Sequence, residues 1–445
     1  MKLSEIAPTL REIGVSPVKS LGQNFLHDRN LAKWIVDQAN VDRKDFVFEI
    51  GPGLGALTEL ALAKDAHILA IEKDKRLVRF LREKFQSEAL EIVHGDALEF
   101  DLRILYTRPK VKLLGNLPYY ISSQLLIKFI EYPSPISLWL FMLQKELAKR
   151  LVASPATRDY GALTLLVQLH HRVEYLRTIP ASVFLPKPEV DSALVRIHPR
   201  DPRELPVCDR VVFEKLVRRG FAQRRKQLGK LIREELPKWD TAAAELGLNP
   251  KARAEELSLR QWIALTNYIA PIISDTSNDR PEESFAVVNQ HDQVVGAAPR
   301  SQVHANNLLH RAVHVLIFNS ARDVFLQFRS RRKDRHPLLW DSSAAGHVNA
   351  GEEYDQAAAR ELREELGIQI PLEKIAKLTA SERTDCEFVS LHCGSHDGKL
   401  RLNPDEIEAG QFFPPSIVDG WIKARPRDFA PAFLECWKIW RERNP

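Results

Sequence analysis

The chain has 445 residues, of which 44% are apolar and 28% are charged. This length exceeds what one hydrophobic core usually supports, so we expect two or three domains of ordinary globular composition. No apolar run is long enough to cross a membrane, and the first residues lack the apolar core of a signal peptide. These features exclude an integral membrane protein and predict a cytoplasmic one.

The net charge of +5 is unevenly distributed along the chain. Residues 1–270 hold 42 basic and 33 acidic side chains, a net charge of +9, whereas residues 271–445 hold 22 basic and 26 acidic ones, a net charge of −4. The basic first part favours a polyanionic partner. The four cysteines form no Cys-x-x-Cys pair, so we expect free thiols rather than a zinc site or a disulfide framework: Cys208, Cys386, Cys393 and Cys436.

A glycine-rich turn follows the first predicted strand. Amphipathic helices are predicted over residues 3–14 and 30–39, and the apolar strand of residues 46–50 then leads into glycines with the spacing Gly-x-Gly-x-Gly and a helical segment as far as Leu62. Glycines at these positions allow a sharp turn and the close approach of a ligand. This pattern is typical of sites for a dinucleotide, a nucleotide or S-adenosylmethionine.

Acidic residues stand at the ends of successive predicted strands. Residues 67–72 end in Glu72, and residues 90–94 are followed by Asp96. A carboxylate at the tip of the second strand is where α/β folds bind the hydroxyls of a ribose. Acidic residues are common on exposed loops, but Glu49, Glu72 and Asp96 behind one glycine turn favour a nucleoside-binding edge.

The fourth predicted strand, residues 111–115, runs into Asn116-Leu117-Pro118-Tyr119. The side-chain oxygen of Asn116 and the carbonyl of Leu117 can accept hydrogens from an exocyclic amine, and the Tyr119 ring can stack on a base. Such contacts would promote attack of the amine on an activated methyl group by alignment and electrostatics, without a strong general base. On its own, the tetrapeptide also fits an ordinary proline turn after a strand.

Together these motifs resemble the ribosomal RNA adenine dimethyltransferases over residues 1–270, and the match extends to residues 22–28, 142–146, 160–161, 184–192 and 221–226. The resemblance implies a Rossmann-like class I methyltransferase domain over residues 1–200 and a small helical RNA-binding subdomain over residues 201–270. It also implies the reaction: two methyl groups pass from S-adenosylmethionine to N6 of each of two adjacent adenines in a small-subunit (16S) rRNA hairpin of the pre-30S subunit.

The same resemblance implies roles for individual residues. Gln23, Asn24 and Leu26 would cover the cofactor, Gly51 would approach its methionine end, Glu72 would bind its ribose and Asp96 its adenine amine. Gly53 and Asn116 would also belong to the cofactor site. Asn116, Leu117, Pro118 and Tyr119 would hold the target adenine next to the cofactor, with Phe184 stacked on its other face, as in enzymes that extrude single bases.

A basic run lies in the predicted helical subdomain. Charge runs are usually solvated faces, but in a basic domain expected to hold structured RNA we assign this one to phosphate contacts, which position RNA without reading its sequence. The residues concerned are Arg218, Arg219, Arg224, Arg225 and Lys226.

Residues 271–284 are polar, contain a proline and predict a linker. A hairpin over residues 285–295 and strands over residues 312–318 and 323–328 then begin a second domain.

Further on, residues 354–366 predict a helix that ends at Gly367. Three glutamates with the spacing i, i+3, i+4 share one face of this helix, and hard oxygen ligands in this arrangement suit Mg²⁺ or Mn²⁺: Glu361, Glu364 and Glu365. The alternative is a purely structural helix of mixed charge that is exposed to solvent.

The complete spacing G-x5-E-x7-R-E-U-x-E-E-x-G-U, where U is aliphatic, resembles the signature of the Nudix hydrolases. The resemblance implies an α/β/α sandwich over residues 285–445 and Mg²⁺-assisted attack of water on a small molecule that contains a diphosphate, with Glu364 in the catalytic set. Arg360 would pair with Glu352 to fix the loop. A further acid would come from Glu406 or Glu408, and the substrate itself is left open.

Residues 310–315, 326–330 and 340–347 look most like the isopentenyl-diphosphate isomerase branch of this superfamily and its hydrolase relatives. Those isomerases use a cysteine just before the box, where this chain has Ser342-Ser-Ala-Ala, so hydrolysis is preferred over isomerisation. The leading interpretation is therefore a methyltransferase fused to a Nudix hydrolase. The alternatives are a ribosome-assembly factor that acts by binding RNA, with an accessory second domain, or an isomerase-like second domain.

Overall fold

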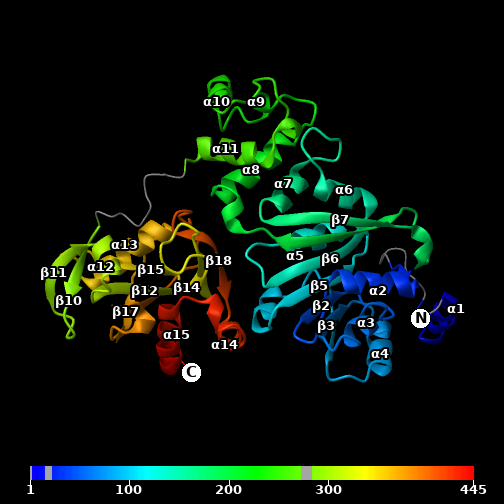
Figure 1. Ribbon diagram of the computed structural model, residues 1–445, viewed down its shortest axis with the longest axis horizontal. Coiled ribbons are helices and arrows are strands. Elements are labelled where there is room, and N and C mark those ends of the chain that lie inside the picture. Colours follow the sequence, from blue (N-terminus) through cyan, green and yellow to red (C-terminus); the bar gives the residue numbers. More distant parts are fainter. Residues whose placement is uncertain (1–2, 16–22, 272–282, 445) are drawn as a thin grey trace. The chain divides into compact units, whose positions relative to one another are not determined.

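The computed structural model of the protein describes residues 3–15, 23–271 and 283–444, which form two compact units, Met1–Ala270 and Pro271–Pro445 (Figure 1). Most of the linker expected over residues 271–284 lies outside the described residues. Within the described ranges, no helix combines the length and the apolar character needed to span a membrane.

The first unit is built on a seven-stranded sheet with the strand order β4-β3-β2-β5-β6-β9-β7. Strands β2 to β6 run parallel, whereas β9 pairs antiparallel with both β6 and β7. The Rossmann-like fold is thereby confirmed, and the four predicted strands agree with β2 to β5 to within one residue. The bounds are β2 Phe46–Ile50, β3 His67–Glu72, β4 Leu90–His94, β5 Val111–Asn116, β6 Ile136–Gln144, β7 His171–Ile179 and β9 Ser192–Pro199.

Helices cover both faces of this sheet (Figure 1). Because successive side chains of a strand point to opposite faces, Phe46, Phe48 and Ile50 of β2 join the core under α5 and α6, whereas Val47 joins the core under α2 and α3. This burial on both faces explains the unbroken apolar runs of the strands. The helices are α1 Leu3–Glu12, α2 Arg29–Gln38, α3 Thr58–Leu62, α4 Lys75–Lys84, α5 Ser122–Phe129, α6 Lys145–Val152 and α7 Ala162–Gln168.

A two-stranded ribbon joins distant parts of the first unit. Strand β1, Phe25–Leu26, pairs antiparallel with β8, Phe184–Leu185. The ribbon therefore ties the segment that precedes the glycine turn to the segment that precedes β9.

The helical subdomain expected over residues 201–270 has a core of its own. This core gathers Phe213, Leu216, Trp239 and Trp262, and the hydroxyl of Tyr160 donates to the carbonyl of Leu257 at 2.9 Å within it. The helices are α8 Arg210–Gly220, α9 Leu228–Leu231, α10 Trp239–Glu245 and α11 Leu259–Ile269.

The second unit contains a nine-stranded mixed sheet. The predicted hairpin is present as β10 and β11, and the long central strand β12 pairs antiparallel with β15 and parallel with β17. The bounds are β10 Ser284–Val288, β11 Val294–Pro299, β12 His310–Phe318, β13 Val324–Arg329, β14 Trp340–Asp341, β15 Ala344–His347, β16 Glu373–Leu378, β17 Glu387–Ser395 and β18 Ile407–Phe413.

Helices complete the sandwich of the second unit: α12 Arg300–Ala305, α13 Tyr354–Leu366, α14 Pro415–Ala424 and α15 Pro431–Arg443. Helix α13 has the predicted bounds and ends at Gly367, whose φ of +69° is the left-handed conformation typical of a helix C-cap. Its Ala358, Leu362 and Leu366 join a core with Val313 and Val315 of β12. Because this apolar stripe faces the sheet, the glutamates of α13 lie along the border of the contact.

Candidate functional site

The glycine turn lies at the carboxyl edge of the parallel strands. Gly51, Gly53 and Gly55 all have positive φ values, of +65°, +59° and +81°, which favour glycine. A Cβ at Gly55 would lie 2.5 Å from the ring of Phe85, and a Cβ at Gly53 would lie 3.1 Å from the ring of Phe25. The turn thus needs glycine for its conformation and for the close packing around it.

A cleft of about 720 Å³ opens in front of this turn. A second hollow of about 390 Å³ adjoins it and shares Asn24, Gly51, Gly53 and Asn116. Most of the predicted cofactor residues therefore meet at one place, as the order of the strands requires. The cleft is lined by Gln23, Asn24, Gly51, Gly53, Glu72, Asp96, Asn116 and Pro118, and Leu26 lines the second hollow.

Glu72 is held by two backbone donors. The amide of Gly53 donates to Oε2 at 3.2 Å, and the amide of Asp74 donates to Oε1 at 2.9 Å. Burial raises the pKa of Glu72, and these two bonds oppose the rise. The carboxyl group is thus fixed beside the turn, in the position expected of a ribose ligand.

Asp96 has a partner that the sequence analysis did not name. Lys73 Nζ donates to Asp96 Oδ2 at 2.7 Å, and the amide of Leu98 donates to Oδ1 at 2.9 Å. The hydrogen bond from Lys73 lowers the pKa of Asp96, so this carboxylate stays ionised. Lys73 and the 53% exposed Tyr120 both line the cleft. Both residues could have been predicted to lie near the cleft, because Lys73 directly follows Glu72 and Tyr120 directly follows Tyr119 in the sequence.

The tetrapeptide from Asn116 to Tyr119 is held from several sides. Asn116 Nδ2 donates to the carbonyl of Asn24 at 3.0 Å, and the amide of Leu117 donates to the carbonyl of Met142 at 3.2 Å. Within the described residues, nothing donates to Asn116 Oδ1 or to the carbonyl of Leu117. The two oxygens expected to receive an amine are therefore both available, and Asn116 and Pro118 face the cleft of the glycine turn.

Phe184 is not placed as expected. Its side chain is 2% exposed and packs in the core with Leu26 and Leu194. Because β8 is paired with β1, the ring is covered and offers no free face to a base. The stacking of Phe184 on a target adenine stays a prediction, and it requires the ring to be uncovered when the base enters.

The basic run in the helical subdomain divides into two groups. Three of its arginines have intramolecular partners: Arg218 pairs with Glu214, Arg219 with Glu234 and Glu235, and Arg224 with Glu255. Arg225 and Lys226 are exposed, and no side chain or carbonyl of the described residues pairs with theirs. The assignment of the run to phosphate contacts stays a prediction, and Arg225 and Lys226 could make such contacts without first giving up an intramolecular ion pair.

In the second unit, the three predicted metal ligands differ in exposure. The side chain of Glu364 is 58% exposed, whereas those of Glu361 and Glu365 are largely buried. Burial raises the pKa of Glu361 to about 7 and that of Glu365 well above its usual value. Glu365 accepts from Gln327 Nε2 at 3.1 Å and from the amide of Ala345 at 3.2 Å. Packed carboxylates of this kind need a compensating cation.

The two candidates for a fourth acid have different surroundings. Glu408 is paired with Arg331 through both carboxylate oxygens. Glu406 is paired with Lys333, and its charge further raises the pKa values of Glu361 and Glu365. Glu406 therefore belongs to the carboxylate cluster, and Glu408 does not.

Arg360 and Glu352 form the expected pair. Arg360 Nε donates to Glu352 Oε1 and Arg360 Nη2 donates to Glu352 Oε2, both at 2.9 Å, and Nη2 also donates to the carbonyl of His347. A bidentate arginine–carboxylate contact has a defined geometry, so it fixes the loop before α13 against the helix.

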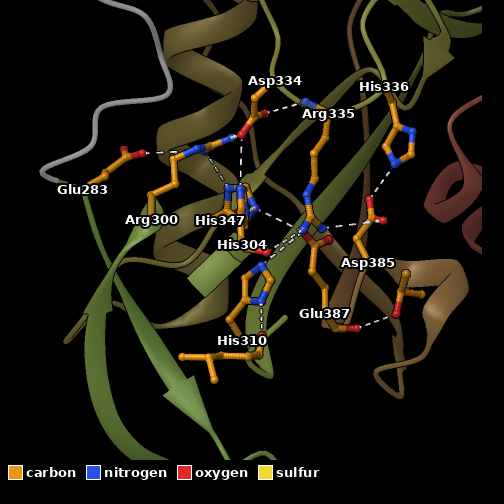
Figure 2. A network of polar contacts seen from close by, with 12 residues as sticks. Glu283, Arg300, His304, His310, Asp334, Arg335, His336, His347, Asp385 and Glu387 are labelled. Carbon is orange, nitrogen blue, oxygen red and sulfur yellow. Dashed lines mark hydrogen bonds and ion pairs between the residues drawn. The ribbon is translucent and has the colours of Figure 1, made fainter. Parts of the chain in front are cut away.

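A histidine cluster lies between α12, β12, β15 and β17 in the second unit, and the sequence analysis missed it (Figure 2). One ring nitrogen from each of His304, His310 and His347 lies within 4.8 Å of the other two. His304 Nε2 is 3.4 Å from His347 Nε2, and Glu387 Oε1 is 3.1 Å from His347 Nε2 and 3.4 Å from His310 Nε2. These residues are separated by up to 83 positions, so no local spacing in the sequence predicts the cluster.

Outer contacts orient all three rings of this histidine cluster. Arg300 Nη1 donates to His347 Nδ1 at 3.2 Å, so the proton of neutral His347 stands on Nε2. His304 Nδ1 lies 3.2 Å from Asp334 Oδ2, and His310 Nδ1 lies 2.8 Å from the carbonyl of Leu308. Both contacts favour a proton on Nδ1, which leaves Nε2 as a lone-pair donor. His310 Nε2 is buried, and it has Glu387 Oε1 as a polar neighbour at 3.4 Å.

The serines that stand where the isomerases have a cysteine make hydrogen bonds inside the second unit. Ser342 Oγ lies 2.8 Å from His314 Nδ1, and Ser343 Oγ donates to the carbonyl of Phe325 and accepts from the amide of Ile317. Both serines are fully buried. All four cysteines are free thiols, as predicted.

Comparison with known proteins agrees with both halves of this description. A family model described as ribosomal RNA adenine dimethylase matches residues 16–271, and a NUDIX domain model matches residues 308–433. A ribosomal RNA small subunit methyltransferase A of Halothermothrix orenii is 38% identical over 286 residues, which cover 61% of this chain and 95% of the relative. Its counterpart from Thiobacillus denitrificans is 40% identical over 255 residues, which cover 57% of this chain and 98% of the relative.

Among solved structures, a dimethyladenosine transferase from Plasmodium falciparum matches 54% of this chain and 95% of its own length, with 24% identity and a TM-score of 0.46. The sequence matches carry the assignment without it. This chain belongs to the ribosomal RNA adenine dimethylase family and carries a NUDIX domain in its second unit.

Proposed function

We propose that the first unit transfers methyl groups from S-adenosylmethionine to N6 of two adjacent adenines in a small-subunit rRNA hairpin, two to each base, on pre-30S subunits in the cytoplasm. The observation that carries this proposal is the orientation of Asn116, whose amide is fixed by Asn24 so that Oδ1 is left to accept from an amine. The family membership and the curated relatives named ribosomal RNA small subunit methyltransferase A support an rRNA substrate.

The residues of the cleft fit the cofactor. The hydroxyls of a ribose suit the fixed carboxyl of Glu72, an adenine amine suits the ionised Asp96, and the backbone at Gly51 and Gly53 leaves room for a close approach. When bound, S-adenosylmethionine supplies an electrophilic methyl group. Asn116 Oδ1 and the Leu117 carbonyl would accept the amine hydrogens and keep the nitrogen lone pair directed at that methyl group.

The test uses small subunits that lack this modification, incubated with the protein and S-adenosylmethionine carrying a labelled methyl group. We expect N6,N6-dimethyladenine in the rRNA, and none with Asn116→Ala, which should still bind the cofactor in a separate titration. Absence of dimethyladenine with the unmodified protein would contradict the proposal. An Asn116→Ala protein that still supports subunit maturation would favour the assembly-factor alternative.

For the second unit we propose Mg²⁺- or Mn²⁺-dependent hydrolysis of a small molecule that contains a diphosphate. Glu361, Glu364, Glu365 and Glu406 would hold the metal, which activates water and polarises phosphoryl oxygens. The residues fit this role because burial raises the pKa values of Glu361 and Glu365 even though Lys333, Arg329 and Arg360 offset part of their charge. Arg360 and Glu352 keep the preceding loop in place around them.

A screen for phosphate release tests this second activity. Nucleoside diphosphate derivatives and other diphosphates are offered with Mg²⁺, with Mn²⁺ and without either ion. We expect metal-dependent hydrolysis of at least one compound, and its loss in Glu364→Gln. Equal release by the unmodified protein and the variant would mean that the carboxylate cluster is not the site.

The histidine cluster supports a second cation position in the same unit, formed by His304, His310, His347 and Glu387. Three of the six separations between these four donor atoms, of 3.1 to 3.4 Å, are close to the edge of a tetrahedron around an ion at usual zinc–nitrogen distances, about 3.3 Å, and the three histidine nitrogens as a set lie within 4.8 Å. The Nε2 of the buried His310, 3.4 Å from Glu387 Oε1, is a donor that such an ion would use, whereas His347 would have to move its proton from Nε2 to Nδ1 and give up the contact with Arg300. Imidazole donors suit Zn²⁺ and other transition metals rather than Mg²⁺.

A further inference from the structure

Tyr119 and Ser192 connect the turn after β5 to the start of β9. The hydroxyl of Tyr119 lies 2.5 Å from Ser192 Oγ, across 73 positions of sequence. Ser192 is fully buried and is the first residue of β9, where it is paired with Gln144 of β6 and Ile179 of β7. Because Ser192 sits between two strands, its hydroxyl is an immobile anchor.

The other end of the Tyr119 side chain is fixed as well. Just before Tyr119, the amide of Leu117 donates to the carbonyl of Met142. Ser122 Oγ donates to the carbonyl of Pro118 at 2.8 Å. The Tyr119 ring is thus held at its backbone end by the turn and at its hydroxyl end by Ser192. Burial raises the pKa of Tyr119, so the hydroxyl stays neutral and serves as a tether rather than as a base.

We propose that Ser192 is a positioning residue that holds the Tyr119 ring, and that this hold matters most for the second methyl transfer to the same nitrogen. The inference rests on the proposed function of the first unit. In each transfer the S–CH₃ bond breaks with its electron pair left on sulfur, an N–CH₃ bond forms, and the nitrogen loses one proton to water.

The second transfer is the more demanding one for alignment. An unmodified adenine offers two N6 hydrogens, one for Asn116 Oδ1 and one for the Leu117 carbonyl. After the first transfer only one hydrogen is left, so only one of these oxygens can still accept from the amine. Stacking of the base on the Tyr119 ring then provides a larger share of the alignment, and a ring that is free to move degrades the second step more than the first.

The test measures both products in one reaction. Ser192→Ala and Tyr119→Phe each remove one side of the contact and keep the aromatic ring. With unmethylated small subunits, N6-methyladenine and N6,N6-dimethyladenine are followed over time by mass spectrometry. We expect the rate of the second transfer, relative to the first, to fall about fivefold, the factor of one typical net hydrogen bond, so that monomethyladenine accumulates. The double variant should behave like either single variant, because both remove the same contact.

Ser137→Ala is the matched control. It removes a serine-to-carbonyl hydrogen bond of 2.9 Å, to Val111, at the opposite end of the same strands, and should keep the ratio of the two products unchanged. A general loss of structure would slow both transfers together or raise KM for S-adenosylmethionine. Either result with both Ser192→Ala and Tyr119→Phe, or additive effects in the double variant, would overturn the proposal.

A second measurement does not depend on methyl transfer. In protein labelled with 3-fluorotyrosine, the ¹⁹F resonance of Tyr119 is identified by its loss in Tyr119→Phe. We expect this resonance to sharpen in Ser192→Ala as the ring moves faster, and an unchanged resonance would contradict the tether. If the unmodified protein makes no methyladenine at all, the proposed function fails, while the resonance still tests the hold of Ser192 on the ring.

Discussion

The side-chain amide of Asn116 donates to the backbone carbonyl of Asn24 at 3.0 Å, across 92 positions of sequence. The bond joins the end of β5 to the segment expected over the cofactor. It also decides which end of the amide is left for a substrate, because Nδ2 is already engaged.

Replacement of Asn116 by aspartate tests this orientation. The aspartate side chain would have no hydrogen to donate, and one of its carboxylate oxygens would face the carbonyl of Asn24. We expect Asn116→Asp to lower the rate of methyl transfer by about 10²-fold or more, in the range of other lost alignment contacts in active sites. Affinity for the small subunit should change by less than about threefold, and a filter-binding assay measures it. Activity close to that of the unmodified protein would show that the amide is dispensable.

The two groups of basic residues in the helical subdomain should behave differently. Arg225 and Lys226 have no partner among the described residues, so Arg225→Ala/Lys226→Ala should weaken binding to small-subunit RNA and reduce the slope of log affinity against log salt by about one to two. Arg224→Ala instead removes a pair with Glu255 and should lower the melting temperature. Titrations at several salt concentrations, together with thermal melts, separate the two effects. The reverse outcome would restore Arg224 as a phosphate ligand.

Glu49 gives the first unit a dependence on pH. It is buried, accepts from Thr58 Oγ1 at 2.7 Å and lines the smaller hollow, and burial raises its pKa to about 7. Between pH 4.5 and 7 the folded protein therefore holds a proton that the unfolded chain has lost, so this group stabilises the fold at low pH, and its contribution is lost as pH rises through 7. We expect Glu49→Gln to remove this slope when thermal melts of both proteins are compared across the window.

The ionisation of Glu49 should also affect the cofactor. S-adenosylmethionine carries a sulfonium charge, so its affinity should increase from about pH 6 to about pH 8 as the nearby carboxyl group ionises. Calorimetric titration measures this increase, and Glu49→Gln should flatten it. An equal pH dependence in both proteins would assign it to another group.

The histidine cluster predicts a metal preference distinct from that of the carboxylates. Zn²⁺ should bind at one equivalent per chain and raise the melting temperature, and His347→Ala should abolish this shift. Glu364→Gln is the matched control because it belongs to the other cluster and should keep the Zn²⁺ shift. Co²⁺ offers an independent readout, since absorption bands of tetrahedral Co²⁺ should appear in the unmodified protein and disappear in His347→Ala. Loss of the shift in Glu364→Gln as well would mean one shared site.

Much of the site follows from local sequence. The glycine turn, Glu72, Asp96 and Asn116 all stand at strand ends, and parallel strands bring their ends to one edge whatever the details of packing. Helix α13 was predictable to the residue because its capping glycine and its apolar spacing agree. Glu361 and Glu365 share a face for the same local reason.

The remaining features depend on contacts between distant segments. Arg224 looks like an RNA ligand until Glu255, 31 positions away, is seen to pair with it. Phe184 is covered because β8 pairs with β1, and no local sequence pattern predicts this pairing. His310, His347 and Glu387 meet only because β12 lies next to both β15 and β17. The choice of Glu406 over Glu408 as the fourth acid also depends on a distant contact, because Glu408 is already paired with Arg331.

The ribbon of β1 and β8 has a consequence for turnover. Two residue pairs, Phe25 with Leu185 and Leu26 with Phe184, connect the segment over the cofactor cleft to the segment that follows β7. If the first unit acts as proposed, we expect a displacement that lets a spent cofactor leave to be passed through these pairs toward Tyr119 and Ser192. Cofactor exchange and the hold on the target base would then be coupled, and an RNA held in place between successive transfers should slow the replacement of its own methyl donor.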